Sequence, residues 1–170
     1  LAQLIAINTH TDGAINLAEA ANLRDGALSG TAAQLDTALA GITNYKGTLE
    51  VTGGVAPSIT ELVTMTSATD AAITLESYSA ALTGTAAQLK TVLEGPLAAQ
   101  YTGAVTLTDE PDLAQLIAIN THTNGAINLS NTVGLRVGAL VGTATELATA
   151  LEGCLLYTSD AADEVDRVYL

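Results

Sequence analysis

Residues 30–35, Gly-Thr-Ala-Ala-Gln-Leu, decide the fold because the chain repeats them. The same six residues return at 84–89, and a looser version, Gly-Thr-Ala-Thr-Glu-Leu, stands at 142–147. A second segment, Leu-Ala-Gln-Leu-Ile-Ala-Ile-Asn-Thr-His-Thr, occupies residues 1–11 and returns unchanged at 113–123. Both segments recur at the same offset of 112 residues. Recurrence at a fixed offset predicts a tandem array of similar structural units.

The repeated segment carries a signal for the start of a helix. Thr31 and Gln34 have the spacing of a capping box, in which each side chain binds a backbone N–H that the helix leaves exposed. One such box contributes about 1 kcal/mol and is weak evidence by itself. Its recurrence at equivalent positions predicts five helix starts, at Thr31, Ser58, Thr85, Asp112 and Thr143. An apolar stripe of helical period follows each box, as with Leu35, Ala38 and Leu39.

A short strand is predicted after most of these helices. Residues 126–129, Ala-Ile-Asn-Leu, alternate between apolar and other positions as a half-buried strand does. Similar strands are expected at 14–17, 48–51, 73–75 and 104–107, and further short strands are candidates at 26–29, 80–83 and 138–141. The expected helix ends are Gly41, Gly95, Gly153 and Asn124-Gly125, residues that tolerate positive φ. A Tyr-x-Gly motif precedes two of the strands, at Tyr45 to Gly47 and Tyr101 to Gly103.

The helices and strands group into three units, residues 1–56, 57–110 and 111–153, each with two helix–strand half-repeats. The first unit is interpreted as truncated at its N-terminus and the third as truncated at its C-terminus, as in a fragment of a longer protein. Helices and strands this short are marginal alone and need neighbours. Strand–helix–strand connections are right-handed, which places parallel strands together and helices beside them. We therefore predict an α/β repeat solenoid with a mainly parallel sheet along one side and helices on the other. The alternative is one compact α/β domain per unit, although no linker rich in Ser or Pro separates the units.

The composition limits the core and the partners. The chain is 48% hydrophobic with no Phe, no Trp and one Met, so the core must consist mainly of Ala, Leu, Ile and Val. The formal charge of −13 disfavours binding to nucleic acids or anionic lipid surfaces. No apolar run approaches the roughly 20 residues that cross a bilayer, so no membrane insertion is expected.

The last seventeen residues are interpreted as foreign. Residues 154–164, Cys-Leu-Leu-Tyr-Thr-Ser-Asp-Ala-Ala-Asp-Glu, resemble a translated sequencing adapter of the kind found at the ends of metagenomic fragments. Residues 154–170 are therefore predicted to be a non-native tail. The only cysteine, Cys154, lies in it, so the remainder has no thiol chemistry. The alternative is that 155–157 form a native strand.

No residue is predicted to be catalytic or to bind a cofactor. His10 and His122 are equivalent, but Ala68 stands there in the middle unit and no second metal ligand keeps the right spacing. Neither histidine has a nucleophile partner. They are interpreted as solvated histidines favoured by the negative end of a helix.

Calcium is the one metal kept as an alternative, with Asp109, Glu110 and Asp112 as its weak candidates. Neither an EF-hand loop nor the glycine-rich calcium nonapeptide is present, and Asp112 already has a predicted role as a helix cap. Gly53-Gly54 is interpreted as a turn and not a phosphate cradle, because no G-x-x-x-x-G-K pattern follows. Threonines such as Thr106 are attributed to strand propensity, since Asn128 interrupts the expected row.

Two longer segments carry a family resemblance. Ala-Leu-x-Gly-Thr-Ala-Ala-Gln-Leu, at 27–35 and 81–89, and Tyr-Thr-Gly-Ala-Val-Thr-Leu-Thr-Asp-x-Pro-x-Leu-Ala-Gln-Leu, at 101–116, resemble repeats of very large secreted bacterial surface proteins. Those proteins are adhesins or carry hemolysin-type repeats. The resemblance covers residues 1–153 and implies export, an extracellular or cell-surface location, and a spacer or adhesive role.

The expected function is therefore structural: a stalk or a broad adhesive surface whose main partners are neighbouring repeats of the same chain. The first alternative is a module that binds glycans, cell-surface components, calcium or ice on an Asn- and Thr-bearing sheet face. It requires polar side chains aligned across at least three strands. The second is an enzyme, which requires a pocket where titratable residues converge.

Overall fold

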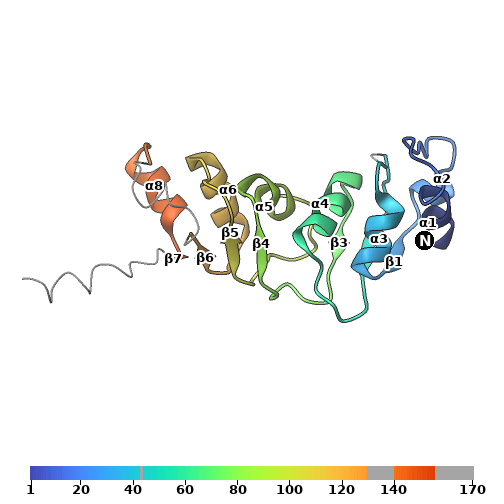
Figure 1. Ribbon diagram of the computed structural model, residues 1–170. Helices are drawn as coiled ribbons and strands as arrows, with labels where there is room; N and C mark the ends of the chain where they lie inside the picture. The colour runs from blue at the N-terminus through green and yellow to red at the C-terminus, as the bar shows by residue number, and fades with distance from the viewer. Residues whose placement is uncertain (43, 130–139, 156–170) are drawn as a thin grey trace, which may run out of the picture.

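The computed structural model describes residues 1–42, 44–129 and 140–155, and in this part of the chain the fold is α/β (Figure 1). The helices are α1 (Ala2–Asn8), α2 (Ala21–Arg24), α3 (Ala32–Leu39), α4 (Ile59–Ala68), α5 (Ala86–Leu93), α6 (Leu113–His122) and α8 (Ala144–Leu151). The strands are β1 (Leu28–Gly30), β2 (Leu49–Val51), β3 (Ile73–Thr74), β4 (Leu82–Gly84), β5 (Val105–Leu107), β6 (Ile127–Asn128) and β7 (Cys154–Leu155).

Every strand pairing is parallel, as predicted, but the strands form two sheets and not one. The first sheet has the order β1-β2-β3, and the second has the order β4-β5-β6-β7. The break follows β3, where the next segment meets it only through a bridge from Ile73 to Leu97. Pro96 precedes Leu97 and has no N–H to donate, which limits how far this pairing can extend.

The main helices pack in the order of the chain. Helix α1 contacts α3, α3 contacts α4, α4 contacts α5, α5 contacts α6, and α6 contacts α8. All five predicted capping boxes form, and the first four N-caps follow one another at 27-residue intervals: Thr31, Ser58, Thr85 and Asp112. Figure 1 shows the helices along one side of the strands, with α1 and α8 at opposite ends of the row.

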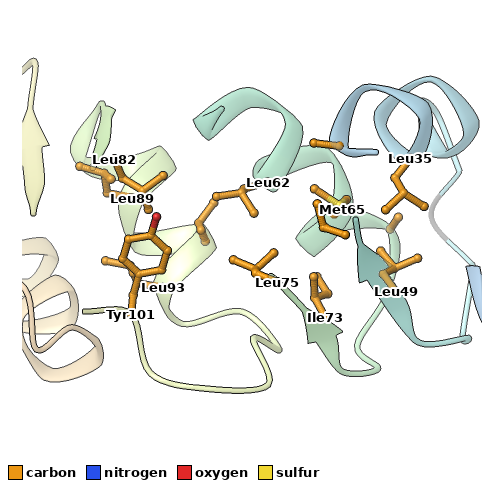
Figure 2. Close-up of a cluster of buried hydrophobic side chains, with 14 of the residues drawn as sticks. Leu35, Leu49, Leu62, Met65, Ile73, Leu75, Leu82, Leu89, Leu93 and Tyr101 are labelled. Atoms are coloured by element: carbon orange, nitrogen blue, oxygen red, sulfur yellow. The ribbon is translucent and has the colours of Figure 1, made fainter. Parts of the chain in front are cut away.

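The core is a band of aliphatic side chains between helices and strands (Figure 2). The leucine four residues after each N-cap is fully buried in the four inner helices, α3 to α6: Leu35, Leu62, Leu89 and Leu116. The strands contribute four further buried side chains to the same core: Leu49, Ile73, Val105 and Ile127. The predicted aliphatic core is confirmed, and its other members among the described residues are Tyr45, Met65 and Tyr101.

The Tyr-x-Gly motif is explained by a close approach between its own backbone and the backbone segment that precedes β1 or β4. The hydroxyl of Tyr45 donates to the Gly26 carbonyl, and that of Tyr101 donates to the Ala80 carbonyl at 2.7 Å. A Cβ atom on Gly47 or Gly103 would overlap the same carbonyl that the tyrosine binds. Glycine is therefore required two residues after the tyrosine because the backbones nearly touch there.

Several predicted details are wrong. Residues 14–17 form no strand, and the Leu17 amide donates instead to Asn44 Oδ1 at 3.3 Å. Helix α6 ends at His122, and Gly125 has no positive φ. Its lack of a side chain instead admits the Gly103 carbonyl. The helix ends predicted at Gly41, Gly95 and Gly153 are confirmed, since α3, α5 and α8 each end two residues before the glycine. Gly41 and Gly153 adopt positive φ, at 72° and 69°, whereas Gly95 packs on the Thr66 side chain.

The candidate extra strands form with shifted bounds. Strands β1 and β4 start two residues later than 26–29 and 80–83. Of the third candidate, 138–141, residues 138 and 139 lie outside the described residues, and 140 and 141 form no strand. The short helix α2 carries no capping box and had no sequence prediction. Cys154 and Leu155 form β7 beside β6, and the rest of the predicted tail lies outside the described residues.

Candidate functional site

The outward face of each sheet carries a row of polar side chains in register. In the second sheet, Thr83 pairs with Thr106, and Thr106 pairs with Asn128. Thr83 is exposed, and the other two are half-buried. Parallel strands lie about 4.8 Å apart, so the row spans three strands at that spacing. The alignment across strands that a ligand-binding face requires is therefore present, although the sequence analysis attributed these threonines to strand propensity.

A second row crosses the first sheet and has a different character. Ser29 pairs with Glu50, and Glu50 pairs with Thr74. All three side chains are exposed. A carboxylate in the centre separates this row chemically from the neutral Thr-Thr-Asn row. The two sheets therefore do not present one uniform surface.

Two of the three calcium candidates, Asp109 and Asp112, accept hydrogen bonds from backbone amides at the starts of two different helices. Asp109 Oδ1 accepts from the Ala86 amide of α5 at 2.6 Å. Asp112 Oδ1 accepts from the Gln115 amide of α6 at 2.7 Å, as its predicted capping box requires. Glu110 is exposed. In the described ranges, no cluster of three or more His, Cys, Asp or Glu side chains converges on a point that could hold a metal ion.

The Gly53-Gly54 turn holds an anion supplied by the chain itself. Both glycines have positive φ, 102° and 71°. Their amides donate to the two carboxylate oxygens of Glu76, at 3.1 Å and 2.6 Å. The prediction of a turn is confirmed, and Glu76 is the partner that sequence reasoning missed. A Gly-Gly pair is typical of a segment whose successive backbone N–H groups can bind an anion. Nothing in the sequence, however, links this pair to a glutamate more than twenty residues away.

The two equivalent histidines have the same local partner. His10 Nδ1 lies 2.8 Å from the Ala6 carbonyl, and His122 Nδ1 lies 2.8 Å from the Ala118 carbonyl. Both side chains are exposed. Each ring thus binds a carbonyl near the end of its helix, the position that the sequence analysis gave it. In the part of the chain that the structure describes, neither joins a group able to hold a metal.

Hydrogen bonds between successive half-repeats recur along the chain. Asn8 Nδ2 donates to the Thr37 carbonyl at 2.7 Å, and Asn120 donates to the Thr149 carbonyl 112 residues further along. Buried threonines also recur at the ends of α4 and α6. Thr69 donates to the Gly47 carbonyl at 3.2 Å, and Thr123 donates to the Tyr101 carbonyl at 3.1 Å. These side chains hold neighbouring turns of the chain together.

Hollows on the described surface lie between neighbouring half-repeats. One of about 440 Å³ is lined mainly by Gln100, Asn120, Asn124, Thr149 and Glu152. Glu152 is its only titratable lining residue. The Cys154 thiol is no reactive nucleophile, because burial raises its pKa to about 11. Its Sγ donates to the Ala150 carbonyl at 3.2 Å.

Comparisons with protein-family models, with curated proteins and with solved structures find no match to this chain. Among the described residues, no helix has both the length and the apolar character that a bilayer crossing requires. The surface features that remain are the polar rows and the contacts between repeats. They are the observations on which a function can be argued.

Proposed function

We propose that the chain is a segment of an α/β repeat solenoid that serves as a stalk or broad interaction surface in a long extracellular bacterial protein. The support is the order of packing: each main helix contacts the next one along the chain, and the core runs through all of them. A string of separate domains would instead bury each unit within itself. The resemblance to repeats of secreted surface proteins supports the location.

The observation that carries the proposal is the reuse of one contact between units. Thr69 of the second unit donates to the Gly47 carbonyl of the first unit at 3.2 Å, and Thr123 of the third unit donates to the Tyr101 carbonyl of the second unit at 3.1 Å. Within each unit, Leu1, Ile59 and Leu113 likewise reach Gly30, Gly84 and Gly142 of the following half-repeat. In a solenoid each repeat contacts only its neighbours, so the same contact recurs along the chain. Recurring contacts of this kind therefore favour stacked repeats, whose function depends on the shape and length of the stack.

The test compares the chain with a version in which residues 1–112 are duplicated in tandem. Continuous stacking predicts that the maximum dimension from small-angle X-ray scattering grows in proportion to the number of repeats, with one rigid cross-section. It also predicts that the longer chain unfolds at higher denaturant concentration, because more interfaces join each repeat to its neighbours. Equal midpoints and a flexible scattering profile would support independent domains instead.

A second candidate function is ligand binding on the face of the second sheet. The observation that favours it is the register of Thr83, Thr106 and Asn128 across three parallel strands. Flat, regularly spaced hydroxyl and amide groups suit glycans or ordered water. The Asp109 and Asp112 carboxylates already bind backbone amides, which makes calcium the weakest ligand of the three.

The experiment for this candidate uses a glycan array, calcium calorimetry and a thermal-hysteresis assay. Binding that Thr83→Val and Thr106→Val abolish would place the ligand on this face. Thr91→Val is the matched control, since Thr91 is also exposed but lies on α5. Absence of a signal in all three assays would leave the passive spacer as the better proposal.

A further inference from the structure

One hollow of the surface is lined by hydrogen-bonding side chains and glycines. It has a volume of about 440 Å³ and lies where the ends of the neighbouring helices α6 and α8 meet (Figure 1). Gln100, Asn120, Asn124, Thr149 and Glu152 line it, and its other lining residues are threonines and glycines. The volume falls within the range of small-molecule sites. A hollow of this size and polarity suits a small ligand that forms many hydrogen bonds.

Thr149 differs from its equivalents in earlier repeats. Thr37 of α3 donates its hydroxyl to the Ala33 carbonyl at 2.8 Å, and Thr91 of α5 donates to the Ala87 carbonyl at 2.9 Å. Both of those threonines are exposed, whereas Thr149 is half-buried. Across the residues that the structure describes, the Thr149 hydroxyl has no hydrogen-bond partner. This hydroxyl is therefore available to a ligand in the hollow.

The side chains beside Thr149 keep unused donors and acceptors. Asn120 donates one side-chain N–H to the Thr149 carbonyl, and Asn124 donates one to Gln100 Oε1 at 3.0 Å. A carboxamide has two N–H donors and an oxygen acceptor, so each asparagine retains one of both kinds. Within the described ranges, the Glu152 carboxylate makes no hydrogen bond or ion pair. The hollow can therefore both donate to a ligand and accept from it.

The hollow does not depend on where the described chain ends. A second hollow, of about 260 Å³, lies one step earlier between the ends of α5 and α6, and it shares Gln100 and Thr121 with the first. Helix α8 packs on α6, yet Gln100 and His122 of this earlier hollow are exposed. A further repeat after α8 would therefore leave the larger hollow accessible.

We propose that the hollow between α6 and α8 binds a neutral saccharide, whose hydroxyl groups contact Thr149, Glu152 and the neighbouring amides. Sugar hydroxyls both donate and accept, as the hollow does, whereas an ammonium group only donates. Glu152 and the formal charge of −13 disfavour an anionic sugar. A calcium ion takes about six to eight oxygen ligands, and a single carboxylate lines the hollow. The proposal goes beyond the structural function above and does not depend on it.

NMR titration of the isotope-labelled full chain tests the proposal. The probes are glucose, galactose, mannose, N-acetylglucosamine, maltose, lactose and cellobiose. At least one of them should shift the side-chain amide signals of Asn120 and Asn124 in a saturable way below about 20 mM. If none does so up to about 50 mM, the proposal is overturned. Calcium chloride is titrated in parallel, and shifts of these signals by calcium but by no sugar overturn it as well.

Two variants locate the binding. Thr149→Val should weaken it about fivefold, because one hydrogen bond is lost, and Glu152→Gln about tenfold, because a charged acceptor is lost. Valine should leave the fold intact, since the Thr149 hydroxyl has no partner among the described residues; circular dichroism checks this. Thr37→Val is the matched control, at the same position of α3, and should keep the wild-type affinity.

Binding that survives both substitutions overturns the site. If Thr83→Val abolishes that binding instead, the sugar lies on the second sheet, as the second candidate function requires. Neither result affects the length scaling that tests the proposed stalk.

Discussion

Asn120 on α6 donates its side-chain N–H to the backbone carbonyl of Thr149 on α8. A side chain of one helix therefore supplies a hydrogen-bond donor to a carbonyl in the last turn of the next helix. Asn8 makes the same contact with the Thr37 carbonyl of α3 and a second one with the Ala40 carbonyl, at 2.9 Å. The last carbonyls of a helix have no partner within it, so a neighbour that supplies one stabilises both helices. Neighbouring half-repeats are therefore joined by hydrogen bonds as well as by buried apolar side chains.

Removal of this side chain is expected to weaken the contact between neighbouring helices. Asn120→Ala and Asn8→Ala should each lower the free energy of unfolding by about 1 kcal/mol, because a carbonyl loses its hydrogen-bond donor. Urea unfolding followed by circular dichroism measures the change. Asn22→Ala, at an exposed position of α2, is the control and should change stability by less than about 0.5 kcal/mol. Equal effects in all three variants would contradict the role of the recurring bond.

The close approach at the Tyr-x-Gly motif predicts intolerance to the smallest side chain. Gly47→Ala and Gly103→Ala should each cost about 3 kcal/mol or more, because the added methyl overlaps a backbone carbonyl that cannot move freely. Thermal unfolding gives the measurement. Gly13→Ala is the control: a Cβ there would meet only the Thr11 hydroxyl at 3.4 Å, an ordinary contact. A Gly103→Ala variant as stable as the wild type would show that the two turns are further apart than described.

The two buried tyrosines predict alkaline unfolding. Burial raises the pKa of Tyr45 to about 12 and also raises that of Tyr101. In the unfolded chain a tyrosine has a pKa near 10. The folded state therefore holds its phenolic protons more tightly, so this stabilisation is complete below about pH 10 and is lost as pH rises toward 12.

Urea unfolding at a series of pH values from 8 to about 12 tests this dependence. The double variant Tyr45→Phe, Tyr101→Phe should be less stable than the wild type at pH 8 by about 2 kcal/mol, since two hydrogen bonds are lost. Its stability should then fall less steeply above pH 10. Parallel curves for the two proteins would mean that other groups cause the alkaline loss.

The carboxylate held by Gly53 and Gly54 predicts a stabilising role for Glu76. Glu76→Ala should cost about 1.5 kcal/mol, because two backbone N–H groups lose a charged acceptor. Glu94→Ala removes an equally exposed glutamate at the end of α5 and should be close to neutral. Denaturant midpoints of the two variants provide the comparison, and identical midpoints would contradict it.

Local signals in the sequence were enough to predict the five helices that begin with a capping box, but not the short helix α2. A capping box joins residues three apart, so Thr31 with Gln34 and its four equivalents were all predicted correctly. The parallel pairing was also predicted, because chain connectivity leaves few alternatives. The strand predicted at residues 14–17 does not form, because a strand depends on contacts outside its own sequence. These residues have the same alternating pattern as 126–129, but a strand needs a neighbour, and the pattern does not reveal whether one is present.

Contacts at long range could not be predicted. Nothing near Gly53 points to Glu76, and the reach of Asn120 to Thr149 depends on how two helices pack. The polar row of the second sheet was missed because the sequence analysis took Asn128 to interrupt a row of threonines, whereas the register places Thr83, Thr106 and Asn128 side by side. Alignment across strands follows from the register, which a single sequence does not contain.

The N-caps Thr31 and Thr85 begin equivalent helices with the same six-residue segment, 54 residues apart. A deletion or duplication of the 54-residue block between them would keep the same six residues at the new junction, so the capping box that starts the helix would be preserved. The chain can therefore change its length in steps of 54 residues without losing the signal that starts a helix at the junction.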